Sequence, residues 1–283
     1  MSEEPTLKPP IKGRGISSNE ASRFTESRTE AVDDGWSSTP DKDDSDPTRP
    51  ATQVFIDSSR TILTPNSSPD IPYDLSINPY KGCEHGCSYC YARPTHAYLD
   101  LSPGLDFETR IFAKPDAAEL LNKAFDKPGY RPEAIAIGAN TDPYQPVERE
   151  LQITRQLLEV FRSYKHPLTL ITKSAMIERD IDILAELAKD NLAQVALSVT
   201  TLDRELCRRL EPRATAPQRR LQAIHRLTDN GIPVTLLFAP VIPALNDNEI
   251  ESVLDATYEA GIRSAAYVML RLPHEVKILF QEW

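Results

Sequence analysis

The chain has 283 residues, a formal net charge of −10 at pH 7, and 40% hydrophobic and 26% charged residues. This composition is typical of a soluble globular protein, and no apolar run is long enough to span a bilayer. The acidic balance disfavours broad, sequence-independent nucleic-acid binding, which depends on Lys and Arg neutralising phosphates. The N-terminus MSEEPTLKPP lacks the basic start and apolar core of a signal peptide, so we expect a cytoplasmic protein.

The first 50 residues have the composition of a polar tail. Their only branched aliphatic residues are Leu7, Ile11, Ile16 and Val32, and they include the acidic run DKDDSD. Such a segment buries too little apolar surface to offset the entropy lost on ordering. We therefore expect residues 1–50 to be disordered or draped over the surface, and residues 51–283 to form one folded domain.

From Val54 onward, short β-rich runs alternate with helical segments, which is the pattern of βα units around a parallel sheet. Several runs are almost continuously apolar, as expected of strands that are covered on both faces. The predicted strands lie at residues 73–78, 134–138, 168–172, 194–199, 233–238 and 265–270.

The segments between these strands have helical spacing. Apolar residues recur on one helical face over 117–125, 153–161 and 221–227. The third of these helices should end at Asn230 and Gly231, a pair suited to a left-handed cap. The next helix is expected to start at Asn246 or Asn248, each with a glutamate three residues on as in a capping box, and to end at Gly261.

Six strands with five helical segments between them predict a partial, TIM-like (βα)6 barrel. A doubly wound sheet is the alternative. In both architectures the functional groups gather at the carboxyl ends of the strands. The residues that follow each predicted strand are therefore the first candidates for a site.

Three of the four cysteines, Cys83, Cys87 and Cys90, fall within eight residues directly after the first predicted strand. Three thiolates can hold three irons of a cubane and leave the fourth iron without a protein ligand. Gly82 and Gly86 allow the tight turns that wrap a loop around such a group. The spacing Cx3Cx2C thus predicts a [4Fe–4S] cluster with one iron open to a small molecule.

Zinc is the alternative metal. It takes four ligands, and His85 or His96 could supply the fourth. Structural zinc sites usually use two separated ligand pairs, whereas Cys207 is far from the cluster in sequence and is expected to be an ordinary buried residue. A non-catalytic interaction module, held by zinc or by a structural cluster, therefore remains the competing class of function. Iron with matching sulfide would support the enzyme, and tight zinc without sulfide would support the module.

The cysteine loop, with Tyr89 just before its last cysteine, resembles the radical S-adenosylmethionine (SAM) superfamily. Members bind SAM on the open iron of a [4Fe–4S] cluster and cleave it reductively to a 5′-deoxyadenosyl radical. The strings KGCEHGCSYCYARPTHAY, GANTDPYQPVERE, LITKSA and SVTTLDRELCRRLEPRA are similar to the spore photoproduct lyase-like branch, over roughly residues 51–283. The resemblance implies a lyase or another radical-transfer reaction, and an electron donor such as flavodoxin or ferredoxin.

Further residues at the strand ends are candidates for contacts with SAM. Asn140, Thr141 and Asp142 follow the second strand and suit the amino group of the methionine moiety. By resemblance, Lys173 after the third strand should meet the SAM carboxylate, which an ammonium charge matches. Many relatives carry a glutamate-containing motif after the second strand, where this chain has Asn140, Thr141 and Asp142. Relatives also often have a glycine at the position of Ala244, so the sequence departs from the common pattern twice.

The last strand ends complete the predicted site. Ser198 and Thr200 offer hydroxyls to the ribose or the carboxylate of SAM. The stretch APVIPALND resembles the adenine-binding segment of the superfamily around Val241 and Ile242. Tyr89 is expected to contact the adenine as well.

The substrate is not specified by the sequence, although a nucleic-acid lesion or a modified nucleotide is one expectation. It predicts a basic channel that uses Arg204, Arg208 and Arg209. Spore photoproduct lyase returns hydrogen through a cysteine near the end of its second strand. The corresponding stretch GANTDPY has none, and Tyr144 is a conjectural substitute. The sequence ends in what looks like the start of a longer helix, and we expect a shortened chain to keep cluster binding better than turnover.

Overall fold

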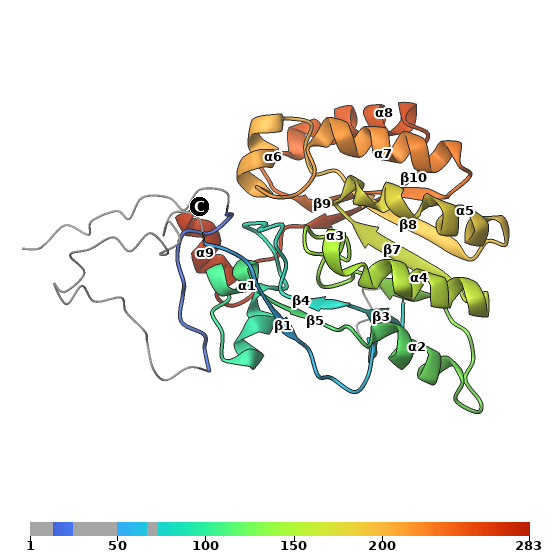
Figure 1. Ribbon diagram of the computed structural model, residues 1–283. Coiled ribbons are helices and arrows are strands. Elements are labelled where there is room, and N and C mark those ends of the chain that lie inside the picture. Colours follow the sequence, from blue (N-terminus) through green and yellow to red (C-terminus); the bar gives the residue numbers. More distant parts are fainter. Residues whose placement is uncertain (1–13, 25–49, 67–72) are drawn as a thin grey trace, which may run out of the picture.

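The computed structural model describes residues 14–24, 50–66 and 73–283. Most of the predicted tail, residues 1–13 and 25–49, lies outside this part, as do residues 67–72. The described residues form two sheets and a layer of helices (Figure 1). The strands of the larger sheet are β2 (Leu63–Pro65), β3 (Leu75–Ile77), β6 (Ile135–Ile137), β7 (Leu168–Thr172), β8 (Ala193–Ser198), β9 (Val234–Val241) and β10 (Ser264–Met269).

The order of the larger sheet is β10-β9-β8-β7-β6-β3-β2. The six strands from β3 to β10 are those predicted from the sequence, and each pairs in parallel with the next. A doubly wound sheet would reverse its strand order at a switch point. The order here runs in one direction, so the partial (βα)6 barrel is confirmed and the doubly wound alternative is wrong.

Helices follow the strands and pack beside one another over the sheet (Figure 1). The predicted helices are confirmed, and the apolar face of α4 is fully buried because its spacing places it against the sheet. The α-helices are α1 (Leu105–Thr109), α2 (Ala117–Phe125), α3 (Glu148–Leu151), α4 (Ile153–Tyr164), α5 (Ile181–Lys189), α6 (Arg204–Leu210), α7 (Pro217–Asp229), α8 (Ile250–Glu259) and α9 (Val276–Glu282). The 3-10 helices are η1 (Arg93–Leu99), η2 (Ala175–Asp180) and η3 (Asp247–Glu249). None of the described helices is long and apolar enough to cross a membrane.

The predicted capping box before α8 is wrong. Asn246 precedes η3, but its side chain makes no cap, and Asn248 lies within η3, so that Glu249 precedes α8 and also makes no side-chain cap. The Asn246 side chain accepts a hydrogen bond from the Ile242 backbone and donates to the carbonyl oxygens of Thr200 and Pro240. Asn246 therefore ties the end of β9 to the end of β8. Ala244, where relatives often have glycine, has a φ of 63°, in the left-handed region that favours glycine.

A smaller sheet, absent from the sequence prediction, lies beside the barrel. It consists of β1 (Gln53–Ile56), β5 (Arg110–Ala113) and β4 (Tyr80–Lys81), in the order β1-β5-β4. Its middle strand β5 pairs in parallel with β1 and antiparallel with β4. Because only Gly82 separates the end of β4 from Cys83, this sheet fixes the point at which the cysteine loop begins.

His166, between α4 and β7, gives the fold a pH dependence that can be tested. Its ring stacks on Phe125 with centroids 4.2 Å apart, and Nε2 lies 2.7 Å from the Tyr130 hydroxyl. Burial lowers the pKa of His166 below its ordinary value. As the pH falls, the imidazole of His166 is therefore protonated at a higher pH in the unfolded chain than in the folded chain. The free energy of unfolding should decrease from about pH 6.5 downward.

We expect His166→Gln to reduce the drop in unfolding free energy between pH 7.5 and pH 5.5, as measured by urea denaturation. The matched control is His225→Gln, because His225 is exposed on α7 and meets water in both states. Equal pH dependence in the His166 variant and the original chain would contradict the assignment.

Candidate cofactor site

The cysteine loop, residues 82–90, leaves β4 and wraps around its three thiols. Cys83 and Cys87 are buried, Cys90 is half-buried, and all three are free thiols. Gly82 and Gly86 have φ values of 81° and 68°, so both adopt the left-handed conformation that the predicted turns require. Burial raises the pKa of the Cys87 thiol, and Glu211 and the other two thiols act in the same direction. The three sulfur atoms therefore lie within electrostatic reach of one another.

Segments from distant parts of the sequence hold the backbone of this loop. Gln145 donates to the Gly82 carbonyl (3.2 Å) and accepts from the Glu84 backbone N–H (3.0 Å). The Ser88 N–H donates to the carbonyl of Leu210 (3.0 Å). The residues that follow β6 and those at the end of α6 thus fix the loop from two sides.

Arg93, to which the sequence assigned no chemistry, is fully buried beneath the loop. Its Nε and Nη2 donate to the carbonyl of Cys87 at 3.0 and 2.8 Å. Its Nη1 donates to the carbonyls of Pro103 and Gly104, and Nη2 also donates to the carboxylate of Glu108. A guanidinium has five N–H groups, so every donor of Arg93 has an acceptor. The side chain therefore acts as a rigid support for the second cysteine.

A buried ionic group centred on Glu211 lies next to Cys87. The carboxylate accepts hydrogen bonds from Tyr89, Arg220 and, at 2.9 Å, Thr200, and Lys173 Nζ lies 3.3 Å from it. Burial opposes ionisation, but Arg220, Lys173 and the hydrogen bonds outweigh it and hold the pKa of Glu211 well below its usual range. Two cations and one anion leave one net positive charge beside the cysteine loop.

Lys173 is placed by three contacts. Besides Glu211, its Nζ donates to the carbonyl of Ala239 (3.2 Å) and lies 5.6 Å from the ring centroid of Tyr89. The Tyr89 ring itself packs with Cys87, Leu210 and Ile242 in a small apolar cluster. The structure therefore brings Tyr89, Lys173, Thr200 and Ile242, four of the residues predicted to contact SAM, together around the second cysteine. Val241, at the end of β9, belongs to the main core instead.

Of the three polar residues that follow β6, Thr141 and Asp142 use their side chains for contacts within the protein, and Asn140 uses its backbone N–H. Thr141 is buried, and its hydroxyl donates to the carbonyl of Tyr80 (2.6 Å). Asn140 is half-buried, and its backbone N–H donates to the side chain of Asn78 (2.8 Å). These contacts shape the turn after β6, and the structure does not bring Thr141 into the group around Glu211.

Asp142 connects the end of β6 to that of β7 and to the cysteine loop. It accepts hydrogen bonds from the backbone of Lys173 (2.8 Å) and the hydroxyl of Thr172 (2.7 Å), and it lies 3.3 Å from His85 Nδ1. Burial raises the pKa of Asp142, but His85 and the hydrogen bonds prevail and lower it below the ordinary value.

Ser198 and Tyr144 lie on the inner side of the fold. Ser198, at the end of β8, is buried, and its carbonyl accepts from Arg220 (3.0 Å). Tyr144 is fully buried in the main core, where its hydroxyl donates to Asp180 (2.9 Å). Tyr144 is therefore enclosed, and the conjecture that it serves as hydrogen donor does not match this placement.

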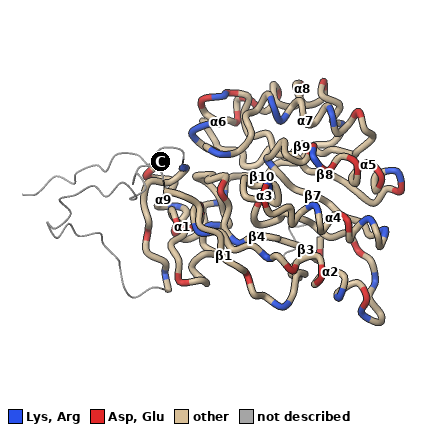
Figure 2. Tube along the Cα trace, in the orientation of Figure 1, with Lys and Arg blue, Asp and Glu red and all other residues tan. Residues whose placement is uncertain are grey.

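The arginines between residues 204 and 220 divide into three groups. Arg204, Arg208 and Arg209 are exposed on α6, whereas Arg220 is buried at Glu211. Figure 2 shows Lys and Arg positions in blue along α6. Arg213 pairs with Glu84 at 3.0 Å, and Arg219 pairs with Glu178 at 2.7 Å. Since Leu206 and Leu210 of α6 pack against the Tyr89 cluster, the exposed arginines lie on the helix that borders the cysteine loop.

The donor set suits an iron–sulfur cubane. Each cysteine ligand of a cubane binds a different iron, so its thiols need not converge on one point. Within the described residues no three His, Cys, Asp or Glu side chains are grouped as ligands of a single ion, which a zinc site would require. Ser88 has a buried hydroxyl without a hydrogen-bond partner in the described part of the chain, and cluster sulfurs accept hydrogen bonds. Cys83, Cys87 and Cys90 are the residues that would hold the cluster.

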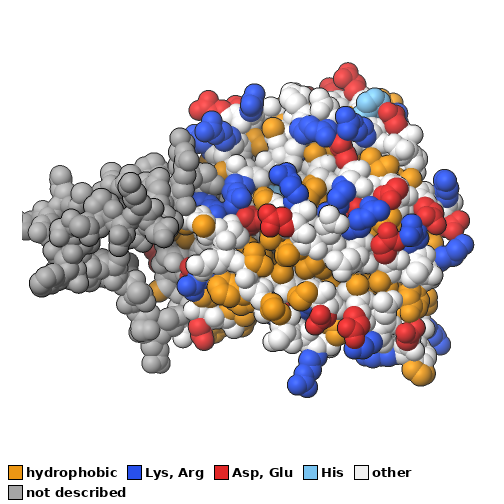
Figure 3. Space-filling model, viewed as in Figure 1, with side chains coloured by type: hydrophobic (Ala, Val, Ile, Leu, Met, Phe, Trp, Pro, Cys, Tyr) orange, Lys and Arg blue, Asp and Glu red, His pale blue; other side chains and the backbone are white. Residues whose placement is uncertain are grey.

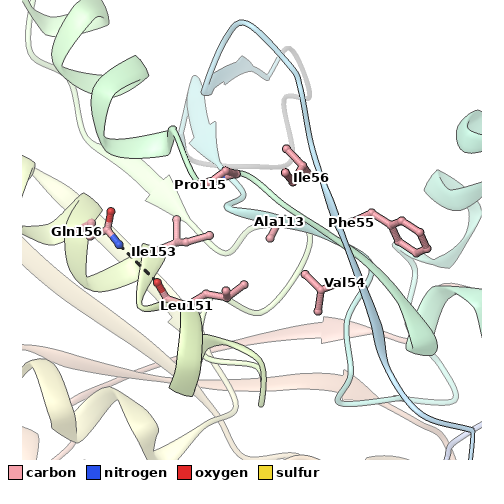
Figure 4. Close-up of a pocket in the computed structure, with 8 residues that line it drawn as sticks. All are labelled: Val54, Phe55, Ile56, Ala113, Pro115, Leu151, Ile153 and Gln156. Atoms are coloured by element: carbon pink, nitrogen blue, oxygen red, sulfur yellow. Dashed lines mark hydrogen bonds between the residues drawn. The ribbon is translucent and has the colours of Figure 1, made fainter.

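A cavity of about 230 Å³ lies elsewhere, between the smaller sheet and α3–α4 (Figure 4). The molecular face drawn in Figure 3 shows hydrophobic side chains gathered near its centre, and the β1 residues are exposed. None of the predicted site residues lines this cavity. Its walls are Val54, Phe55, Ile56, Ala113, Pro115, Leu151, Ile153 and Gln156.

The sequence matches the family profile of the radical SAM superfamily over residues 77–257, which includes the cysteine loop and five of the six parallel strand ends. The chain belongs to this superfamily. Its family therefore implies a [4Fe–4S] cluster and SAM as cofactors, in agreement with the prediction from the cysteine spacing.

Known relatives agree with this assignment. An uncharacterized protein of Mycobacterium tuberculosis is 34% identical over 215 residues, which are 75% of this chain and 63% of that protein. One of Methanocaldococcus jannaschii is 26% identical over 66% of this chain and 67% of that protein. The chain thus spans less than two thirds of the mycobacterial relative.

Solved structures share the fold. Spore photoproduct lyase in complex with a dinucleoside spore photoproduct has a TM-score of 0.61 at 16% identity, over 81% of this chain and 65% of that one. Streptococcus suis SuiB, bound to its precursor peptide SuiA, has a TM-score of 0.50 at 20% identity, over 69% of this chain and 39% of that one. At these identities the similarity establishes the fold alone.

Proposed function

We propose that Cys83, Cys87 and Cys90 bind a [4Fe–4S] cluster and that the chain cleaves SAM reductively. The observation that carries the proposal is the position of these three free thiols, on one loop at the carboxyl end of β3, beside a buried group with a net positive charge. When it is reduced and bound to SAM, the cluster supplies the electron for the cleavage. An electron donor such as flavodoxin or ferredoxin is the proposed reductant, in the cytoplasm.

The residues around Cys87 are suited to hold SAM. The side chain of Lys173 is 17% exposed, so it can meet a carboxylate, while Arg220 keeps Glu211 neutralised. Tyr89 and Ile242 offer an apolar surface for the adenine. We propose Lys173 as the carboxylate ligand, Tyr89 and Ile242 as adenine contacts, and Thr200 as the hydroxyl that keeps Glu211 in place.

A nucleic-acid lesion or a modified nucleotide is the proposed substrate. The fold is that of a lyase solved with a dinucleoside photoproduct, and three exposed arginines line α6 next to the site. Incubation of a cluster-loaded, SAM-cleaving preparation with a defined thymine photoproduct tests the repair reaction. Unchanged photoproduct after many turnovers of SAM would refute that substrate.

The decisive experiment measures 5′-deoxyadenosine after anaerobic reconstitution with iron and sulfide, followed by SAM and a strong reductant. We expect product from the original chain and at least a thousandfold less from Cys87→Ala, since loss of a cluster ligand removes the chemistry. Cys207→Ala is the matched control, because Cys207 is a buried cysteine on α6 outside the loop. Its sulfur lies 3.8 Å from Glu211 and 3.6 Å from Arg220, but these two residues remain paired with each other when the thiol is removed. This variant should retain both iron and product.

Two results would overturn the proposal. One is tight zinc without sulfide in the purified protein, which would favour the interaction module. The other is a loaded cluster that yields no 5′-deoxyadenosine from SAM under reducing conditions.

A further inference from the structure

Residues 14–24, here called the N-terminal strap, touch the cysteine loop at Gly15 and then run along α1 toward the start of α9. The strap is drawn in blue in Figure 1, where it runs past α1 and α9. Its Gly15 is in such close contact with the loop that a Cβ atom added to it would stand 1.6 Å from the carbonyl oxygen of Gly86. Even a methyl group therefore cannot be accommodated at Gly15 unless the strap or the loop moves.

Hydrogen bonds continue from this contact to the second cysteine. The backbone N–H of Gly15 donates to Glu108 Oε2 (3.1 Å), and the other oxygen of Glu108 accepts from Arg93. Arg93 in turn donates twice to the carbonyl of Cys87. Glu108 and Arg93 are both fully buried, so the strap completes a continuous polar connection beneath the cysteine loop.

Several further contacts hold the strap along its length. Arg14 donates to the carbonyls of Glu108 (3.2 Å) and Pro50 (2.8 Å). The carbonyl of Ser18 accepts from the Leu105 backbone (3.2 Å), and that of Glu20 accepts from Ser102. At its end, Arg23 pairs with Glu275 beside α9 at 3.3 Å. These anchors reach α1, the residues before it and the C-terminal part of the chain.

We infer that the N-terminal strap shields the cysteine loop and limits the access of oxygen and other small oxidants to the group bound there. The inference rests on the proposed cluster. Cys83 and Cys87 are only 7% and 8% exposed with the strap in place. Exposure controls both the oxidation of thiols and the lifetime of iron–sulfur groups, so a cover over the loop has a direct chemical consequence.

The variant Gly15→Ala tests this inference in the full chain, with Ser17→Ala as the matched control. Ser17 lies two residues away in the same strap, and its side chain is exposed. Both proteins are reconstituted with iron and sulfide, and the loss of cluster absorbance is followed in air and under argon. Oxidation of a cluster and its thiols follows their exposure to the oxidant, so a gap of one methyl group's size above the loop should raise the rate by roughly an order of magnitude. We expect Gly15→Ala to lose its cluster about tenfold faster in air than Ser17→Ala, with no difference under argon.

Equal rates in air for the two variants would overturn the inference. So would an equal acceleration in air and under argon, since that result indicates a loosened fold rather than a lost shield. Both results leave the proposed function intact.

Labelling of the cysteines in the metal-free chain gives a second, independent measurement. A thiol-alkylating reagent should modify Cys83 and Cys87 about tenfold faster in Gly15→Ala than in Ser17→Ala, because access limits the reaction. Cys207, which the strap does not contact, serves as the internal standard and should react equally in both. If the original chain binds no cluster, the proposed function fails, and this labelling still decides whether the strap covers the loop. Unchanged labelling of Cys83 and Cys87 would refute the cover.

Discussion

Replacing Glu211 with alanine is expected to lower the free energy of unfolding by about 3–5 kcal/mol, the range observed when one partner of a buried ion pair is removed. The loss follows from burial, because Arg220 is fully enclosed and would keep its charge without a carboxylate. Urea denaturation of the metal-free chain at pH 7 measures the effect. The pKa of Glu211 is lower in the folded chain than in the unfolded chain. The ionised carboxylate therefore contributes its full stabilisation above the pKa of the unfolded state, and this stabilisation is lost only as the pH falls through the pKa of the folded state.

Glu178→Ala is the matched control for this prediction. Glu178 also binds two arginines, Arg219 and Arg226, but their side chains are 40% and 60% exposed. Water solvates these arginines when the carboxylate is removed, so the expected cost is about 1 kcal/mol or less. A Glu178 variant as unstable as the Glu211 variant would show that burial does not set the energy of the Glu211 group.

Replacing Lys173 with methionine is expected to weaken SAM binding by roughly 10–150-fold. A hydrogen bond to a charged group contributes about 1.5–3 kcal/mol, and each 1.4 kcal/mol changes a dissociation constant tenfold. Methionine has a similar length, and Glu211 keeps its pairing with Arg220, so the fold should persist. Equilibrium dialysis of labelled SAM against the anaerobically reconstituted protein measures the change.

Lys165→Met is the control for Lys173→Met, because Lys165 lies at the exposed end of α4 and its side chain is 76% exposed. It should bind SAM as the original chain does. The same dissociation constant for all three proteins would remove Lys173 from the proposed site while leaving the cluster assignment untouched.

The barrel was predictable because its strands are short apolar runs that recur between helices with one apolar face. The same alternation of strands and helices predicted where the cysteine loop lies, because the loop comes directly after the first predicted strand. The smaller sheet was not predicted. Its strands β1 and β5 have only four residues each and β4 has two, so they are at or below the shortest run that the apolar pattern can identify. The apolar residues of β1 are moreover exposed, so their pattern does not mark a buried strand.

The buried charges near the site were harder to predict. Arg220 lies among the arginines of residues 204–220, and a run of charges is usually a solvated helix face. Arg220 nevertheless precedes Ala223, Ile224 and Leu227 by three, four and seven residues. That spacing places it on the buried face of α7, and it is the signal that could have revealed the Glu211 group. The polar residues after β6 show the opposite case. They were expected to face SAM, but Thr141 and Asp142 form hydrogen bonds with neighbouring backbone and side chains.

The contacts of Asp142 have a consequence for the way in which the protein unfolds. This one carboxylate joins the ends of β6 and β7 to His85 in the cysteine loop. A loop without regular secondary structure usually opens independently of the sheet beside it and exchanges its amide hydrogens quickly. Here, opening the loop breaks the contact of His85 with Asp142 and leaves a buried carboxylate without one of its partners. The amides of Cys83 and Ser88 should therefore exchange more slowly than those of a loop that lacks such a contact.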